Sequence, residues 1–125
     1  MSLDLRIRRS DDRPLSLDDW RAAVARVPGA ALAEDAVEMG RNPATGQAIV
    51  MPAREGRVRV GRMLLNWTEG GVLLSAPYEF AEPGHPDRAV VFALARAADA
   101  RVEAPLLDEP SVLHEDGGTS PLDRP

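Results

Sequence analysis

The chain contains no cysteine and no lysine, and only five of its 125 residues are aromatic. The lack of cysteine excludes disulfides, thiolate metal sites and cysteine nucleophiles. The lack of lysine excludes a phosphate-binding Walker loop, which requires that residue. Because aromatic residues are scarce, we expect a core built mainly from leucine, valine and alanine.

Long apolar runs are also lacking. The longest, residues 89–95, is bounded by Arg88 and Arg96 and is far shorter than the ~20 residues that cross a bilayer. The first residues do not form the apolar stretch of a signal peptide. We therefore expect a cytoplasmic protein without membrane contact.

Charge is unevenly distributed along the chain. Fourteen arginines and fourteen acidic residues precede Glu103, whereas six acidic residues and one arginine follow from that point. The formal net charge of -5 therefore resides at the C-terminal end. We predict one domain over residues 1–104 and an acidic, disordered tail over residues 105–125. Such a tail could shield the basic run at residues 54–62, or it could serve only to keep the protein soluble.

Hydrophobic periodicity predicts the secondary structure. Alternating or apolar segments indicate strands at residues 3–7, 37–41, 47–51, 57–67 and 72–76, and residues 100–103 could add a short one. Helical spacing indicates helices at residues 16–27 and 86–98. This order predicts an α+β fold, an antiparallel meander of four to six strands with two helices. The alternative is a small bent β-barrel, in which Gly56 and Gly61 let the strands curve and close.

The first helix carries clear boundary residues. Ser16 can cap its N-terminus, and Pro28 followed by Gly29 can end it. Its apolar stripe includes Trp20. Residues on such apolar faces form the predicted core: Leu5, Ile7, Trp20, Val24, Val58, Val60, Leu65, Leu74, Val91 and Leu94.

Four features together carry a resemblance to other proteins. They are the short N-terminal strand, the Ser16-led helix with Trp20, the Asn42-Pro43-x-Thr45-Gly46 turn, and the end of the second helix at residues 94–98, which precedes Arg101 and Val102. In these features residues 3–102 resemble a group of small uncharacterised bacterial proteins. The shared motifs are structural, so the resemblance implies no activity.

One basic run is a candidate site for a phosphate or carboxylate partner. It consists of Arg54, Arg57, Arg59 and Arg62. On a strand, Arg57 and Arg59 share one face while the neighbouring valines point into the core. The run could contact an anion or a nucleic-acid backbone. It could also be a solvated sheet face paired with nearby acids.

Phe92 is a candidate contact between chains. It lies one helical turn from both Arg88 and Arg96, on the side expected to face water. Exposed aromatic residues of this kind occur at protein interfaces, so we expect the second helix to mediate a homodimer. The alternative is that the helix is covered on two sides and Phe92 is buried.

No motif predicts a catalytic, cofactor or metal site. His85 is expected to begin the second helix or lie in a loop, and His114 lies in the acidic tail. We therefore expect a non-enzymatic binding or regulatory protein, immunity-like or adaptor-like, that acts on a protein partner. The alternative is a nucleic-acid-associated small β-barrel that uses the arginine run, and an enzyme is the least expected class.

Overall fold

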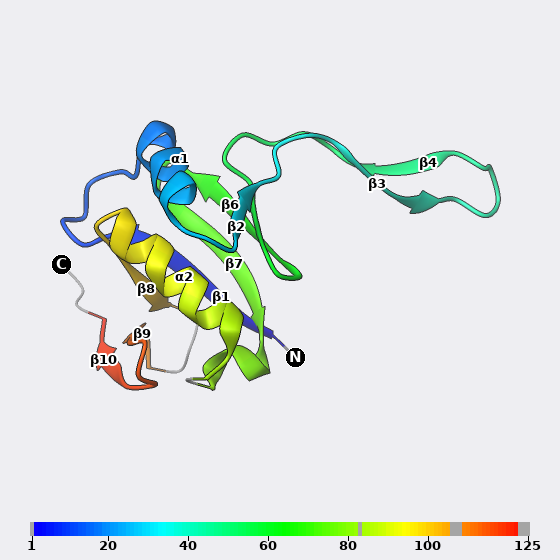
Figure 1. Ribbon diagram of the computed structural model, residues 1–125. Coiled ribbons are helices and arrows are strands. Elements are labelled where there is room, and N and C mark those ends of the chain that lie inside the picture. Colours follow the sequence, from blue (N-terminus) through cyan, green and yellow to red (C-terminus); the bar gives the residue numbers. More distant parts are fainter. Residues whose placement is uncertain (1, 83, 106–108, 123–125) are drawn as a thin grey trace.

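The structure, a computed structural model, describes residues 2–82, 84–105 and 109–122 (Figure 1). Its helices are α1 (Leu17–Arg26), the short 3-10 helix η1 (Tyr78–Ala81) and α2 (Pro86–Ala97). Its strands are β1 (Ser2–Arg9), β2 (Ala30–Leu32), β3 (Val37–Arg41), β4 (Ala48–Met51), β5 (Val58–Val60), β6 (Met63–Thr68), β7 (Gly71–Pro77), β8 (Ala100–Ala104), β9 (Ser111–Leu113) and β10 (Thr119–Pro121). No helix among the described residues is long and apolar enough to cross a membrane.

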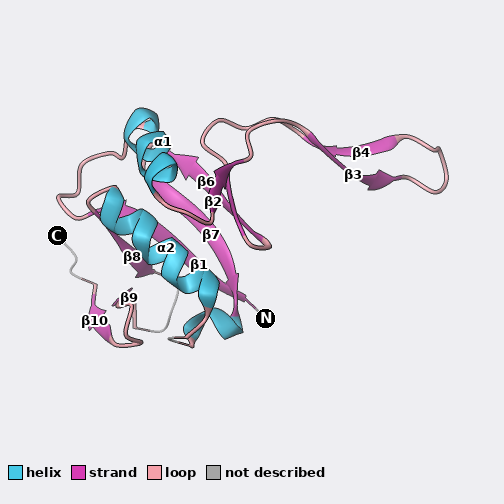
Figure 2. Cartoon of the chain, viewed as in Figure 1, coloured by secondary structure: helices cyan, strands magenta, loops and turns pink. Residues whose placement is uncertain are grey.

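The described strands form two antiparallel sheets. The larger has eight strands in the order β10-β9-β8-β1-β7-β6-β5-β2, and the smaller pairs β3 with β4. Both α1 and α2 lie over one face of the larger sheet (Figure 2). The α+β class and the antiparallel sheet are confirmed, although the sheet is larger than the four to six strands predicted. It stays open between its edge strands β10 and β2, so the barrel alternative is wrong.

The core lies between the two helices and the sheet. All ten predicted core residues are buried there. At the start of α1, the Ser16 hydroxyl accepts a hydrogen bond from the Asp19 backbone N–H at 3.1 Å, as the sequence predicts. Trp20 is fully buried, and its indole N–H donates to the Gly56 carbonyl at 2.8 Å. This bond satisfies the one polar atom that the tryptophan brings into the core.

The chain reverses direction where the sequence predicts one continuous strand at residues 57–67. Strands β5 and β6 instead pair antiparallel, with Gly61 and Arg62 between them. Gly61 has a φ of 59°, which favours glycine, and an added Cβ would come within 2.5 Å of the Asp87 carboxylate. The prediction of a single strand is therefore wrong. The turn was not recognised in the sequence because it lacks the Asn-Gly or Asp-Gly pair that marks many tight hairpins.

The C-terminal segment extends the sheet beyond the predicted domain boundary at residue 104. Strand β9 pairs with β8, and β10 pairs with β9. Because these strands are only three residues long and carry turn-forming residues between them, their sequence is typical of coil. The parts of the predicted disordered tail at residues 106–108 and 123–125 lie outside the described residues.

Strands β3 and β4 form a hairpin that projects from the body of the molecule (Figure 1). We call residues 37–51 the arm, and the flanking residues 33–36 and 52–57 its root. The predicted turn at the tip is confirmed: Asn42 accepts hydrogen bonds from the backbone N–H groups of Ala44 and Gly46, at 2.9 and 2.8 Å. The arm is therefore a well-formed hairpin, although it belongs to neither layer of the body.

Candidate interaction site

Arg57 holds the root of the arm together. Its guanidinium donates to the carbonyls of Ala33 and Asp35, both at 2.7 Å, on the segment that enters the arm. It also donates to the Pro52 carbonyl, at 2.9 Å, on the segment that leaves. Arg57 is only 2% exposed, so it does not share a solvated face with Arg59 as the sequence predicts. A guanidinium can be buried in this way because backbone carbonyl groups accept hydrogen bonds from its N–H groups.

Glu34 ties the root to the body. Its carboxylate accepts hydrogen bonds from the Gly56 backbone N–H at 2.6 Å and from the Arg21 guanidinium of α1 at 2.7 Å. The pKa of Glu34 lies below its ordinary value because the Gly56 N–H, and then Arg21, stabilise the charged carboxylate. The root is therefore fixed both across its two segments and against α1, and it orients the arm.

The other members of the arginine run lie apart from one another. Arg54 approaches the Trp67 carbonyl near one end of β6, at 3.4 Å, whereas Arg62 lies in the turn at the other end. Arg59 is exposed on β5. With Arg57 buried, the four residues do not form one shared basic face.

Arg88 and Phe92 belong to an internal cluster. Phe92 is only 7% exposed, and the Arg88 guanidinium carbon lies 4.9 Å from its ring centroid and 5.5 Å from that of Phe80. The buried guanidinium donates to the backbone carbonyls of Phe80, His114 and Glu115. Burial lowers the pKa of Arg88 from its ordinary value.

This arginine anchors the C-terminal segment to α2. Arg96 adds an ion pair with the Glu115 carboxylate on the surface of the same helix. The described contacts of the acidic segment are therefore with α2 and β8, and not with the arginine run it was predicted to shield. Phe92 is buried, as the alternative interpretation has it, and it is not a surface aromatic contact.

Both histidines have local structural partners. The ring Nδ1 of His85 accepts the Asp87 backbone N–H at 3.2 Å and caps α2, which agrees with its expected place at the helix start. The Nε2 atom of His114 lies 2.6 Å from the Ser120 hydroxyl across the β9–β10 hairpin. Among the described residues, no three histidine or acidic side chains come together as metal ligands.

Large apolar side chains are exposed mainly on the arm. Met39 is 62% exposed, Ile49 53% and Val50 51%. Leu32, on β2 just before the root, is also exposed. This surface was not predicted, although the run Ala48–Met51 carries a signal for it: apolar side chains lie on both faces of the strand, where one-sided burial would require alternation.

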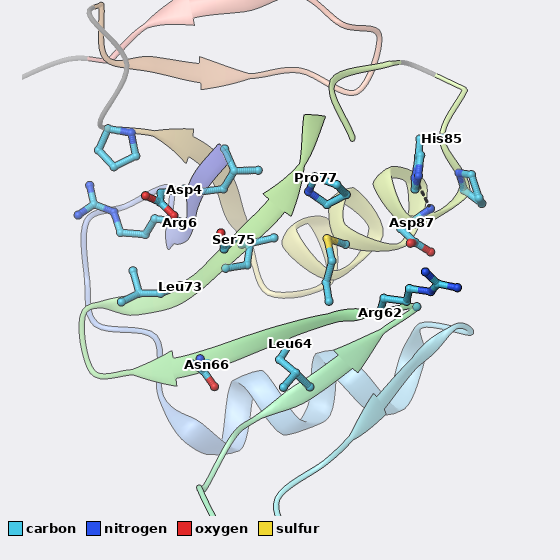
Figure 3. Close-up of a pocket in the computed structure, with 16 residues that line it drawn as sticks. Asp4, Arg6, Arg62, Leu64, Asn66, Leu73, Ser75, Pro77, His85 and Asp87 are labelled. Atoms are coloured by element: carbon cyan, nitrogen blue, oxygen red, sulfur yellow. Dashed lines mark hydrogen bonds between the residues drawn. The ribbon is translucent and has the colours of Figure 1, made fainter. Parts of the chain in front are cut away.

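A groove of about 1100 Å³ lies on the sheet face opposite the helices (Figure 3). Leu64 and Asn66 of β6 line it together with Leu73 and Ser75 of β7. Their neighbours Leu65 and Leu74 are buried, so strand alternation directs these four side chains away from the helices. Leu73 is 48% exposed and is the large apolar residue most accessible in the groove.

Charged side chains stand at the two ends of the groove. Asp4 and Arg6 of β1 line one end, and Arg62 and Asp87 line the other, where the β5–β6 turn meets α2 (Figure 3). Arg6 is engaged in an ion pair with Glu103 at 2.6 Å. The described structure gives no ion pair to the other three side chains. The groove therefore combines an apolar floor with charges of both signs at its rim.

Glu103 lies fully buried beside the groove and is held by two arginines. Arg6 reaches one carboxylate oxygen and Arg101 reaches the other. Burial alone raises the pKa of Glu103, but the hydrogen bonds from Arg101 and Arg6 outweigh it, so the pKa lies below its ordinary value. This network is a structural element that connects β1 to β8.

Comparison of the chain with protein-family models, with curated proteins and with solved structures returned no match. The resemblance to small bacterial proteins therefore stays a prediction.

Proposed function

We propose that the protein is a non-enzymatic binding protein that acts through protein–protein contact, with the arm as its contact element. The observation that carries this proposal is the exposure of Met39, Ile49 and Val50 on one projecting hairpin. These side chains lie on both faces of the hairpin, and large apolar side chains exposed together on one projecting element are typical of interaction surfaces.

The physics of a two-stranded hairpin supports the same conclusion. An isolated hairpin is at best marginally stable in water, and each of its outer edges presents unpaired backbone groups. The arm carries only one charge pair along its strands, Glu38 with Arg41, whose charged atoms are 3.4 Å apart. A partner that covers the arm would bury apolar side chains and could pair with the free edges. The buried Arg57 and the Glu34 carboxylate hold the root in place, which reduces the entropy lost when the arm binds.

Site-specific photo-cross-linking tests this proposal. A photoreactive amino acid placed at Val50 on the arm should form a covalent adduct with another polypeptide in the native cell. The matched control places the same amino acid at Ala22, which is exposed on α1 and lies outside the arm. Absence of an adduct at Val50, or equal adducts at both positions, would contradict the arm as the contact element.

A further inference from the structure

We propose that the groove on the open sheet face receives the arm of a second copy of this chain, so that two copies exchange arms about a two-fold axis. This inference rests on the proposed role of the arm and names its partner. It starts from two features of the same molecule: the exposed apolar side chains of the arm and the apolar side chains that line the groove.

The arm does not fill the groove of its own chain. No residue of the arm or its root lines the groove. The root is clamped by Arg57, which binds both of its segments, and by Glu34, which binds Gly56 and α1 through Arg21. Folding the arm back onto its own sheet would break these buried hydrogen bonds, each of which is costly to leave unmade. Within the described part of the chain, the arm therefore leaves its own groove open to an arm from another copy.

The floor of the groove matches the composition of the arm. Leu64 and Leu73 offer apolar contact to side chains such as Met39 and Ile49. The Asn66 amide and the Ser75 hydroxyl also face the groove, and neither makes a side-chain hydrogen bond with another described residue. Such groups can pair with the unpaired backbone edge of a hairpin laid beside them. An arm that enters the groove thus finds partners for its apolar side chains and its free backbone groups.

The charges are complementary in the same contact. The arm brings Glu38 and Arg41, and both are more than half exposed. The rim of the groove presents Asp4 and Asp87 for an arginine, and Arg62 for a glutamate. Opposite charges at a rim favour correct encounter and register more than they add affinity. The mixture of signs on both surfaces also avoids the repulsion that a single-sign patch would cause between identical chains.

Several features favour a second copy over an unrelated partner. Arm and groove lie on one chain, so a two-fold dimer covers both surfaces at once, whereas an unrelated partner for the arm leaves the groove open. The fourteen arginines and fourteen acids that precede Glu103 balance, so this part of the chain carries no net charge that would drive two copies apart. A two-fold axis makes the contact twice, which helps to reach the ~1,200–2,000 Å² that stable interfaces bury.

Sedimentation of the full chain and two variants tests the exchange. Ile49→Asp places a charge on the arm, and Leu73→Asp places one in the groove. Because both side chains are about half exposed in a single chain, both variants should fold normally, which circular dichroism can verify. We expect the wild type to sediment as a dimer and each variant to weaken the dimer at least about 100-fold, since each loses both contacts. Ala22→Asp on α1 is the matched control and should leave the dimer unchanged.

Mixing the two variants provides the decisive readout. An Ile49→Asp chain keeps its groove and a Leu73→Asp chain keeps its arm, so one intact contact can form between them. The mixture should therefore contain a heterodimer that neither variant forms with itself. A wild type that stays monomeric at its highest soluble concentration, larger assemblies in place of a dimer, or a mixture without heterodimer would each overturn the inference. If the Val50 photo-cross-link then captures a different protein, the proposed function stands without the exchange; if it captures nothing, both fail.

Discussion

The body and the arm of this protein both have valines in short strands, but the body buries these side chains and the arm exposes them. Val60 on β5 is 1% exposed, whereas Val50 on β4 is 51% exposed, although both lie in short antiparallel strands. Strand pairing satisfies the backbone in each case. Only β5 has a layer of helices over it, which removes its valine side chains from water (Figure 2). Strand pairing and burial are therefore separate properties: a paired strand outside the two layers leaves its apolar side chains exposed to water.

The C-terminal hairpin β9–β10 provides an instructive intermediate. Like the arm it consists of two short strands, but β9 pairs with β8 and the turn is anchored to α2 by Arg88. The arm has an equivalent buried arginine, Arg57, but this residue fixes only the root. Anchoring at one point holds the C-terminal hairpin on the body, whereas the clamp at the root leaves the arm projecting.

The largest expected effect lies in the body. Trp20→Ala removes a fully buried indole and its hydrogen bond to Gly56, and should lower the free energy of unfolding by about 3–5 kcal/mol. Chemical denaturation measures this loss. Ile49→Ala on the arm, which also removes a large apolar side chain, should change it far less. An unchanged denaturation midpoint for Trp20→Ala would contradict the expectation that the body, and not the arm, provides the stability of the fold.

An effect of intermediate size is expected at the C-terminal anchor. Arg88→Met keeps a long side chain but leaves the carbonyls of Phe80 and His114 without their donor, and should cost about 2–3 kcal/mol. Amide hydrogen exchange should accelerate throughout β9 and β10. In contrast, Arg96→Met removes only an exposed ion pair and should cost less than ~1 kcal/mol. If β9 and β10 keep their protection in Arg88→Met, the anchor lies elsewhere.

The smallest effect on stability is expected from a matched pair of valine substitutions, one at a buried position and one at an exposed position. Val60→Ala should destabilise the chain by about 2 kcal/mol, since it removes buried methyl groups and leaves a cavity. Val50→Ala should change stability by less than ~0.5 kcal/mol. Thermal unfolding must be compared at protein concentrations low enough to keep the chains apart, because association stabilises the folded state. Equal losses in the two variants would mean that the arm is covered within a single chain.

Local patterns in the sequence were sufficient to predict much of the body and the turn at the tip of the arm. The cap at Ser16, the turn beginning at Asn42 and all ten core residues follow from spacing and side-chain chemistry that act over a few neighbouring residues. The β5–β6 turn was missed because it lacks the Asn-Gly or Asp-Gly pair of many hairpins, and the close approach of Asp87 to Gly61 comes from a residue that is remote in the sequence. Less of the candidate site was predicted, since neither the arm surface nor the groove was recognised from a local sequence pattern.

The sequence by itself determined which residues can form strands, helices and a core, because propensity and periodicity are local properties. Only the tertiary structure decided where the charged and apolar exceptions lie. Arg57 and Arg88 are buried because carbonyl groups from distant segments converge on them, and their own neighbours in the sequence do not reveal this. Ile49 is exposed because its hairpin leaves the sheet and no helix crosses it. Burial depends on what other parts of the chain place over a residue, and that is settled only when the whole chain is packed.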